Sequence, residues 1–288
     1  MKHLFLITAF YFIVGSAFSQ AANTGIDTSL KFNQRYTKCE KKWVVLSKKD
    51  TASYYLFGFI YIDSQAGFTF DLQGSFKVNS DNQYITDPKP KDHSLKLRII
   101  PNWQLVALLP EKHFSELGIK PEPDWIKGYY AYTDTVRHNY RWGWIYNDQG
   151  EPAIALTYLE PAYRSNPHTP GLEFEIAYAY NALNQYDAAI KILEPAIQNK
   201  PDNMFFYKEL GYAYYHKKAY KQAIDTYKTG LGYADNKKSE AKGELAFILA
   251  NAYKSTGNEN EYKNWMIKGK EYTPPESPLY KNFIDAGF

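Results

Sequence analysis

Two patterns of hydrophobic residues divide the chain into a first and a second half. Between residues 41 and about 109, aromatic and β-branched residues form short runs, and one run alternates, with Phe68, Phe70 and Leu72 on one face. Beyond residue 136, a set of small and aromatic positions recurs every 34 residues instead. The sequence therefore predicts a strand-rich first half and a repetitive second half.

The first half contains five segments with the composition of strands. They are residues 43–46, 53–63, 67–78, 95–100 and 103–109. A short polar turn separates the second from the third, so we expect these two to form a hairpin. The polar, proline-bearing stretch 79–93 is predicted to be a loop, and residues 111–119 a short helix that ends at Gly118. These segments predict a small antiparallel β-domain over residues 36–126, and they leave its strand pairing open.

The clearest repetition in the second half lies between two nine-residue segments. The segment "LEPAYRSNP" begins at Leu159, and "LEPAIQNKP" begins at Leu193, 34 residues later. The same offset relates Tyr146 to Tyr180, and a further step reaches Tyr214. Chance rarely produces such a phase-locked set of positions, so we interpret this half as a structural repeat.

The repeated positions resemble those of the tetratricopeptide repeat, a pair of antiparallel helices. Four copies can be aligned, at residues 136–169, 170–203, 204–237 and 243–276, with an insertion at 238–242. Small residues at 143, 177, 211 and 250 would let the paired helices approach to the low end of the usual 8–10 Å. The fourth copy departs most, with Tyr262 at an alanine position, as expected of a terminal repeat.

The resulting fold class is α+β. We expect the antiparallel β-domain to be followed by an all-α solenoid of about four helix–turn–helix repeats over residues 127–276. The aromatic run at 125–132 follows a proline-bearing linker, which favours docking of the β-domain on the first repeat. Residues 277–288 are expected to form a C-terminal tail or cap.

The N-terminus has the pattern of a secretory signal. Lys2 precedes an apolar core at residues 4–14 and small residues at 17 and 19, which predicts a cleavable signal peptide over residues 1–19. The core is too short to cross the roughly 30 Å of membrane hydrocarbon. We expect a flexible segment at 20–35, a mature chain without a transmembrane segment, and a periplasmic or secreted location.

Composition argues against several classes of function. The net charge is +3, and removal of Lys2 lowers it to +2, which is too balanced to indicate a nucleic-acid partner. The single cysteine, Cys39, can form no internal disulfide, and no motif pairs it with a histidine. Phosphate-loop and zinc-protease motifs are absent, and no two histidines have a close metal-ligand spacing. We therefore expect no catalytic residues, no metal and no cofactor.

The resemblance also implies where a partner binds. In tetratricopeptide domains the first helix of each repeat lines a concave groove, which here implies Arg137, Tyr140, Trp144, Asn147, Phe174, Tyr178, Asn181, Lys208, Tyr212, Tyr215, Phe247, Asn251 and Lys254. Trp144, Tyr178 and Tyr212 occupy equivalent positions and form an aromatic stripe, and two of the asparagines form a short ladder. Aromatic side chains would stack on a peptide while the amides hold its backbone. Alternatively, the β-domain or the tail covers these aromatic residues.

These observations favour a non-enzymatic scaffold of the bacterial cell envelope that binds a protein or peptide partner. Two alternatives stay open. The aromatic β-domain could bind glycans in envelope or polysaccharide handling, or an enzyme site could lie at the junction of the two domains. The partner and the oligomeric state cannot be deduced from these residues.

The repeat register makes one prediction about stability. Ala189 occupies a small position inside the second copy. Replacing it with tryptophan should overpack a helix crossing and lower the free energy of unfolding by roughly 1–3 kcal/mol. Thermal unfolding of Ala189→Trp measures this, and an unchanged melting temperature would contradict the register.

Overall fold

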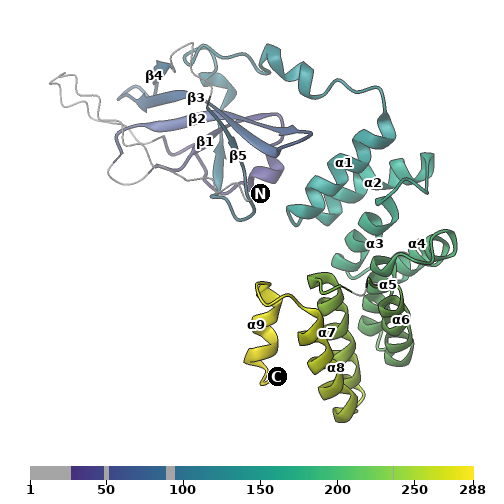
Figure 1. The fold of residues 1–288 in the computed structure, drawn as a ribbon. Coiled ribbons are helices and arrows are strands. Elements are labelled where there is room, and N and C mark those ends of the chain that lie inside the picture. The colour runs from purple at the N-terminus through teal and green to yellow at the C-terminus, as the bar shows by residue number, and fades with distance from the viewer. Residues whose placement is uncertain (1–26, 49–51, 89–94, 236) are drawn as a thin grey trace.

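The chain folds into a twisted β-sheet joined to a curved array of helices (Figure 1). The structure, a computed structural model, describes residues 27–48, 52–88, 95–235 and 237–288. The predicted α+β class is confirmed, with the sheet preceding the helices in the chain. The predicted signal peptide lies outside the described residues.

The sheet contains six strands within the described residues. They are β1 (Lys42–Leu46), β2 (Tyr55–Asp63), β3 (Gly67–Val78), β4 (Tyr84–Pro88), β5 (Leu95–Arg98) and β6 (Val106–Leu108). Their order is β4-β3-β2-β1-β6, and each neighbouring pair is antiparallel. The twelve-residue β3 also pairs with β5, opposite Thr69 to Leu72, so β4 and β5 occupy successive parts of one edge.

Two local predictions for the first half are wrong. The stretch expected to be a loop contains β4, because Tyr84 is buried and stacks on Phe76 with ring centroids 4.1 Å apart. An edge strand also tolerates a proline such as Pro88. The expected helix at 111–119 forms only one 3₁₀ turn, η2 (Glu111–His113), since a segment this short gains too few bonds to offset helix nucleation.

Alternate residues of each strand point to opposite sides, and each face of the sheet contributes to a buried cluster. One face packs under residues 110–130, which include a second 3₁₀ segment, η3 (Asp124–Tyr129), with Ile126 among the buried residues. The opposite face carries Phe68 and Phe70 toward the helices. The segment expected to be flexible is instead packed where it is described, since Leu30 is buried and Gln34 exchanges two backbone hydrogen bonds with Val106.

In the described part of the chain, the helices form four successive pairs and one final helix. They are α1 (Thr135–Asp148), α2 (Pro152–Ser165), α3 (Leu172–Ala182), α4 (Tyr186–Asn199), α5 (Met204–His216), α6 (Tyr220–Gly232), α7 (Glu240–Ser255), α8 (Glu259–Tyr272) and α9 (Pro278–Asp285). Each pair corresponds to one aligned copy of the repeat. Helix α7 begins three residues before the aligned fourth copy, because the Ser239 side chain accepts a hydrogen bond from the backbone N–H of Lys242 and caps it.

Small residues lie at the helix crossings, as the register predicted. A Cβ atom at Gly143 would overlap Leu159, and one at Gly211 would overlap Tyr227. Ala189 is fully buried. The turn inside each pair is also repeated, since residues 150, 184, 218 and 257 all have positive φ, between 60° and 75°. Only two of these four are glycines, so the sequence reveals the shared turn incompletely.

The C-terminal segment forms a cap. Helix α9 inserts Phe283, which is fully buried, with its ring edge-on to Phe247 at 5.5 Å between centroids. A Cβ atom at Gly269 would come within 2.8 Å of the same ring, so this glycine lets α9 approach α8 closely. Helix α9 therefore covers the last pair as the first helix of a further repeat would.

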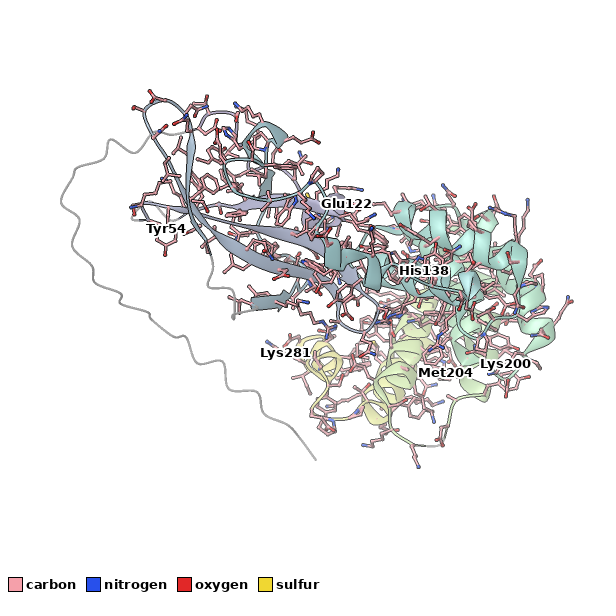
Figure 2. All side chains as sticks on the ribbon, turned by 90° about the horizontal axis from the view of Figure 1, so that it is seen from above. Tyr54, Glu122, His138, Lys200, Met204 and Lys281 are labelled. Carbon is pink, nitrogen blue, oxygen red and sulfur yellow. The ribbon has the colours of Figure 1, made fainter. Side chains whose placement is uncertain are left out.

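One carboxylate joins the sheet, the connector and the first repeat. Glu40, which precedes β1, accepts hydrogen bonds from Tyr130 Oη at 2.9 Å, from Trp142 Nε1 at 3.0 Å and from the Tyr146 hydroxyl. The Tyr130 hydroxyl in turn accepts a bond from the backbone N–H of Ile62 in β2, at 3.0 Å. Because α1 supplies two of these donors, Glu40 fixes the first helix against the sheet. The boundary between the sheet and the helices lies near His138 in Figure 2.

A second contact fixes the start of α2. The Glu151 carboxylate accepts a hydrogen bond from Thr37 Oγ1 at 2.7 Å and pairs with Lys38 at 2.9 Å and Arg35 at 2.8 Å. Burial opposes ionisation of Glu151, but the Thr37 and Lys38 hydrogen bonds and the two positive charges outweigh it and lower its pKa. The sheet and the first repeat thus meet through two hydrogen-bonded carboxylates, the half-buried Glu40 and the buried Glu151, as well as through apolar side chains.

Removing the Glu40 carboxylate should loosen this junction. In Glu40→Ala, the donors of Tyr130, Trp142 and Tyr146 lose their acceptor, and the free energy of unfolding should fall by roughly 2–4 kcal/mol. Glu40→Gln keeps an acceptor oxygen and should lose less. Denaturant unfolding measures both, with Glu276→Ala, at an exposed position, as the control. Equal stability of Glu40→Ala and the control would contradict this role.

Candidate functional site

A cleft of about 210 Å³ lies where the first helices of the first three repeats come together. Its lining residues come from α1, α3 and α5, and they are Trp144, Asn147, Asp148, Phe174, Glu175, Tyr178 and Lys208. The structure therefore brings together five of the residues predicted to line the groove. Sequence reasoning missed the two carboxylates, Asp148 and Glu175.

The aromatic stripe is open to solvent at two of its three positions. Tyr178 is 40% exposed and Tyr212 is 38% exposed. Trp144 is partly buried, because the Arg141 guanidinium lies 4.3 Å from the centre of its ring. Arg141 is itself held by the turn between β2 and β3, where it donates to Ser64 O at 2.6 Å and Gln65 O at 3.1 Å. The sheet thus positions the first member of the stripe.

The asparagine ladder serves the repeat itself. Asn147 Nδ2 donates to Glu175 O at 2.9 Å and to Glu175 Oε2 at 2.8 Å. The equivalent pair one repeat later, Asn181 and Glu209, makes the same two bonds at 3.0 and 2.9 Å. Both asparagines are almost completely buried, and in the described residues each Oδ1 accepts no hydrogen bond. The expectation that these amides hold a peptide backbone is corrected: their N–H groups join one repeat to the next.

The remaining predicted residues do not line this cleft. Arg137 and Tyr140 line a pocket at the junction with the sheet. The Tyr215 hydroxyl is 2.9 Å from Ser255 Oγ, which ties α5 to α7.

The fourth repeat contributes packing and local contacts. Phe247 packs against α9, so the tail covers this part of the groove. Asn251 Nδ2 donates to the carbonyl of Phe247 in its own helix at 3.0 Å, and Lys254 lies 4.8 Å from the ring centre of Tyr262. The open part of the groove therefore runs over the first three repeats.

One carboxylate that lines the cleft, that of Glu175, is buried and forms no ion pair with a described residue. Glu175 is 8% exposed, and burial raises its pKa from 4.5 to about 7, although the Asn147 hydrogen bond opposes this. The charges of Glu209 and Asp148 raise the same pKa further. Burial also raises the pKa of Glu209, where Lys208, 3.9 Å away, acts in the opposite direction. Glu175 and Glu209 are one repeat apart in the sequence, which is the signal that could have found them.

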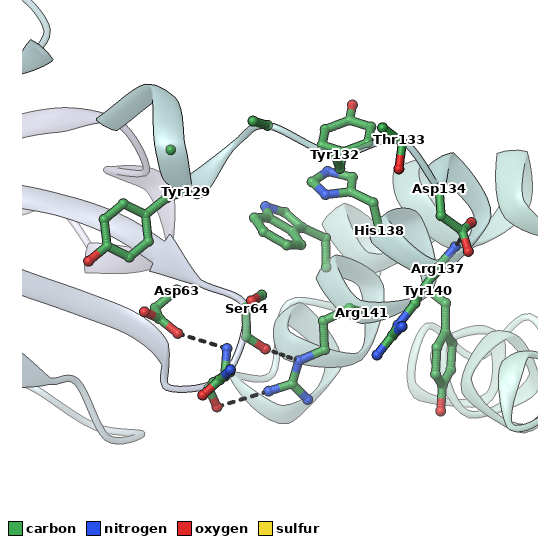
Figure 3. A pocket seen from close by; sticks show the side chains of 14 residues that line it. Asp63, Ser64, Tyr129, Tyr132, Thr133, Asp134, Arg137, His138, Tyr140 and Arg141 are labelled. Carbon is green, nitrogen blue, oxygen red and sulfur yellow. Dashed lines mark hydrogen bonds between the residues drawn. The ribbon is translucent and has the colours of Figure 1, made fainter. Parts of the chain in front are cut away.

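A larger pocket, of about 820 Å³, lies between the β2–β3 turn, the connector and α1 (Figure 3). The His138 ring is stacked between Tyr132 and Trp142, at 3.5 and 4.0 Å between centroids, and burial lowers its pKa. Within the described chain, His138 has no hydrogen-bonded acidic partner. This pocket is where an enzyme site at the domain junction would lie, but it contains no hydrogen-bonded pair of nucleophile and base.

Two other reactive side chains are structural. Burial raises the pKa of the Cys39 thiol to about 11, so it stays protonated at neutral pH. His113 is buried against the ring of Tyr84, at 3.7 Å, with Nδ1 2.8 Å from Glu116 Oε2. In the part of the chain that the structure describes, no group of three or more acidic, histidine or cysteine side chains could hold a metal.

The family of the repeat is identified by comparison. A family model described as tetratricopeptide repeat matches residues 146–210, from the end of α1 to the middle of α5. The helices over residues 146–210 therefore match the tetratricopeptide repeat. No curated protein matches the chain.

Solved structures of MamA are similar to about half of this chain. One, MamA MSR-1 C2, is 23% identical, with 49% of this chain and 77% of that chain covered, at a TM-score of 0.41. Another, residues 41 to the end of MamA from Desulfovibrio magneticus RS-1, is 16% identical, with 48% and 75% covered, at 0.43.

The buried carboxylate makes the stability of the tetratricopeptide array depend on pH. Because the pKa of Glu175 is raised, the folded chain keeps a proton that the unfolded chain releases, and the free energy of unfolding falls as the pH rises from about 4.5 to about 7. Glu175→Gln removes this titration and keeps an acceptor for Asn147. It should stabilise the protein by up to roughly 3 kcal/mol at about pH 8 and change little at about pH 5.

Thermal unfolding at both pH values measures this effect. Glu276→Gln, at an exposed position, is the matched control and should change little at either pH. A stabilisation by Glu175→Gln of the same size at both pH values would contradict the assignment of the buried charge.

Proposed function

We propose that the protein is a non-enzymatic scaffold that binds a protein or peptide partner in the groove formed by α1, α3 and α5. The observation that carries this proposal is the cleft between these helices, together with two exposed tyrosines one repeat apart on the same face. Tyrosine gives a large contact area with few rotatable bonds, which suits a binding surface. The rigid helices hold both rings at a fixed spacing before a partner arrives, so little ordering is needed on binding.

We considered that the β-domain or the C-terminal tail covers the aromatic residues of the groove. Such covering occurs only at the two ends of the groove. Helix α9 covers Phe247, and Arg141 covers one side of Trp144. Tyr178 and Tyr212 lie between these points and keep more than a third of their surface exposed. The middle of the groove, over α3 and α5, is therefore the region that we propose a partner occupies.

The location of this scaffold is part of the proposal. The charged start and short apolar core of residues 1–19 support export through a signal peptide, to the periplasm or the outside of a bacterial cell. No helix in the described ranges has the length and hydrophobicity needed to cross a membrane.

The glycan-binding alternative loses its main support. It rests on the aromatic residues of the β-domain, but Phe57, Phe59, Phe68 and Phe70 are each no more than 2% exposed. Rings buried in the two faces of the sheet cannot stack on a sugar. Packing explains these four rings, whereas Tyr54 is exposed.

Affinity capture from an extract of the source cells tests the proposal. The bait is the full mature chain, compared with the groove variant, which combines Trp144→Ala, Tyr178→Ala and Tyr212→Ala. A control variant combines Tyr54→Ala, Tyr233→Ala and Ile267→Ala, three exposed side chains that do not line the cleft. Circular dichroism first establishes that both variants are folded.

The expected result is a protein captured by the wild type and the control variant and lost, by at least tenfold, with the groove variant. Capture of the same proteins by all three baits would contradict a binding groove. The β-domain would then be the next surface to test.

A further inference from the structure

We infer that the cleft between α1 and α3 holds one basic side chain of the partner, a lysine or an arginine, between aromatic rings and carboxylates. The inference rests on the proposed groove function and adds the chemistry of the partner. It starts from an imbalance of charge in the cleft that the chain itself does not compensate.

Two carboxylates and one ammonium group line the cleft, and the ammonium group is already engaged. Lys208 lies 3.1 Å from Glu244 Oε2 and 3.3 Å from Oε1. The described partners of the two lining carboxylates are neutral amides, since Glu175 accepts from Asn147 and Asp148 accepts from Gln149 Nε2 at 2.7 Å. Neither forms an ion pair with any described residue. A cation from outside would therefore form an ion pair that neither carboxylate has within the described chain.

The next repeat indicates which group such a site accepts. Glu209 is equivalent to Glu175 and is held by Asn181 in the same way that Asn147 holds Glu175. Beside Glu209 the chain places its own ammonium group, Lys208, at 3.9 Å. The position equivalent to Lys208 in the preceding repeat is Phe174, 34 residues earlier. The chain thus supplies a lysine at one of two equivalent carboxylates and leaves the other without one.

The walls of the cleft suit a cation. The rings of Trp144, Phe174 and Tyr178 line it, and positive charge is attracted to the faces of such rings. The guanidinium of Arg141, 4.3 Å from the ring centre of Trp144, already makes this kind of contact on one side of the cleft. The three aromatic residues come from two helices that the repeat packing fixes, so the walls are present before the ligand.

The size of the cleft agrees with this occupant, and its lining offers acceptors for an ammonium group. A volume of about 210 Å³ is below the roughly 300 Å³ at which small-molecule pockets begin, and it fits a single side chain. Asn147, which is 4% exposed, lines the cleft, and its Oδ1 accepts no hydrogen bond from the described residues. An ammonium group has three donors, enough for this oxygen and the two carboxylates. An acidic side chain would face two like charges, and an apolar one would leave the two carboxylates without an ion pair.

Selection from a library of phage-displayed random dodecapeptides, on the full mature chain, tests the inference. The expected peptides share one position that holds lysine or arginine. Replacing that residue with methionine in a synthetic peptide should weaken binding at least tenfold. The affinity should also fall as the pH drops below about 7, where Glu175 takes up a proton.

Three variants make the test specific to the cleft. Asp148→Asn combined with Glu175→Gln should weaken the peptide at least tenfold. Asp225→Asn combined with Glu276→Gln changes the charge equally at exposed positions outside the cleft and should change the affinity less than twofold. Phe174→Lys copies the next repeat by placing a lysine beside Glu175, and it should abolish selection for a basic residue.

The outcomes separate this inference from the groove function on which it rests. Peptides that require Tyr178 and Tyr212 but share no basic position would overturn the inference and leave the groove function standing. If no peptide is selected, or if the selected peptides bind the groove variant equally well, both fail.

Discussion

The hydrogen bonds to the Glu40 carboxylate are the interaction on which the arrangement of this protein depends. They join the connector and α1 to the residue just before β1, so the first helix of the array cannot shift without breaking them. The same docking brings the β2–β3 turn to Arg141, which in turn lies over Trp144. The wall of the candidate site is thus set by the sheet, although every residue that lines the cleft belongs to a helix. A polar junction of this kind also fixes one orientation, because each buried donor needs its acceptor.

Within the array, regular repetition builds the scaffold and a break in repetition creates the site. Asn147 and Asn181 make identical bonds to the next repeat, as a periodic structure requires. Phe174 and Lys208 occupy equivalent positions but differ in charge, and this difference leaves Glu175 without a cation. A buried carboxylate that is ionised near neutral pH costs stability, and the described partner of the Glu175 carboxylate is the neutral amide of Asn147.

The sequence predicts those features in which residue size is restricted at positions that recur with the repeat. The crossings at Gly143 and Gly211 follow directly from the 34-residue period, because only small residues fit there. It predicts less where an amino acid has several possible environments. Carboxylates are common, so burial of Glu175 could not be deduced until the fold placed it. An asparagine on a helix face could equally bind a peptide or bond to the next repeat. Strand β4 was missed because polar residues surround Tyr84 in the sequence.

The central claim, that the sheet and the first repeat form one unit that fixes the wall of the groove, is tested most directly by native-state hydrogen exchange. The account predicts that the amides of α1 and of β1 to β3 exchange through one common opening with the same free energy. It would be contradicted if the amides of α1 opened together with α5 and α6 at a lower free energy while the sheet remained protected.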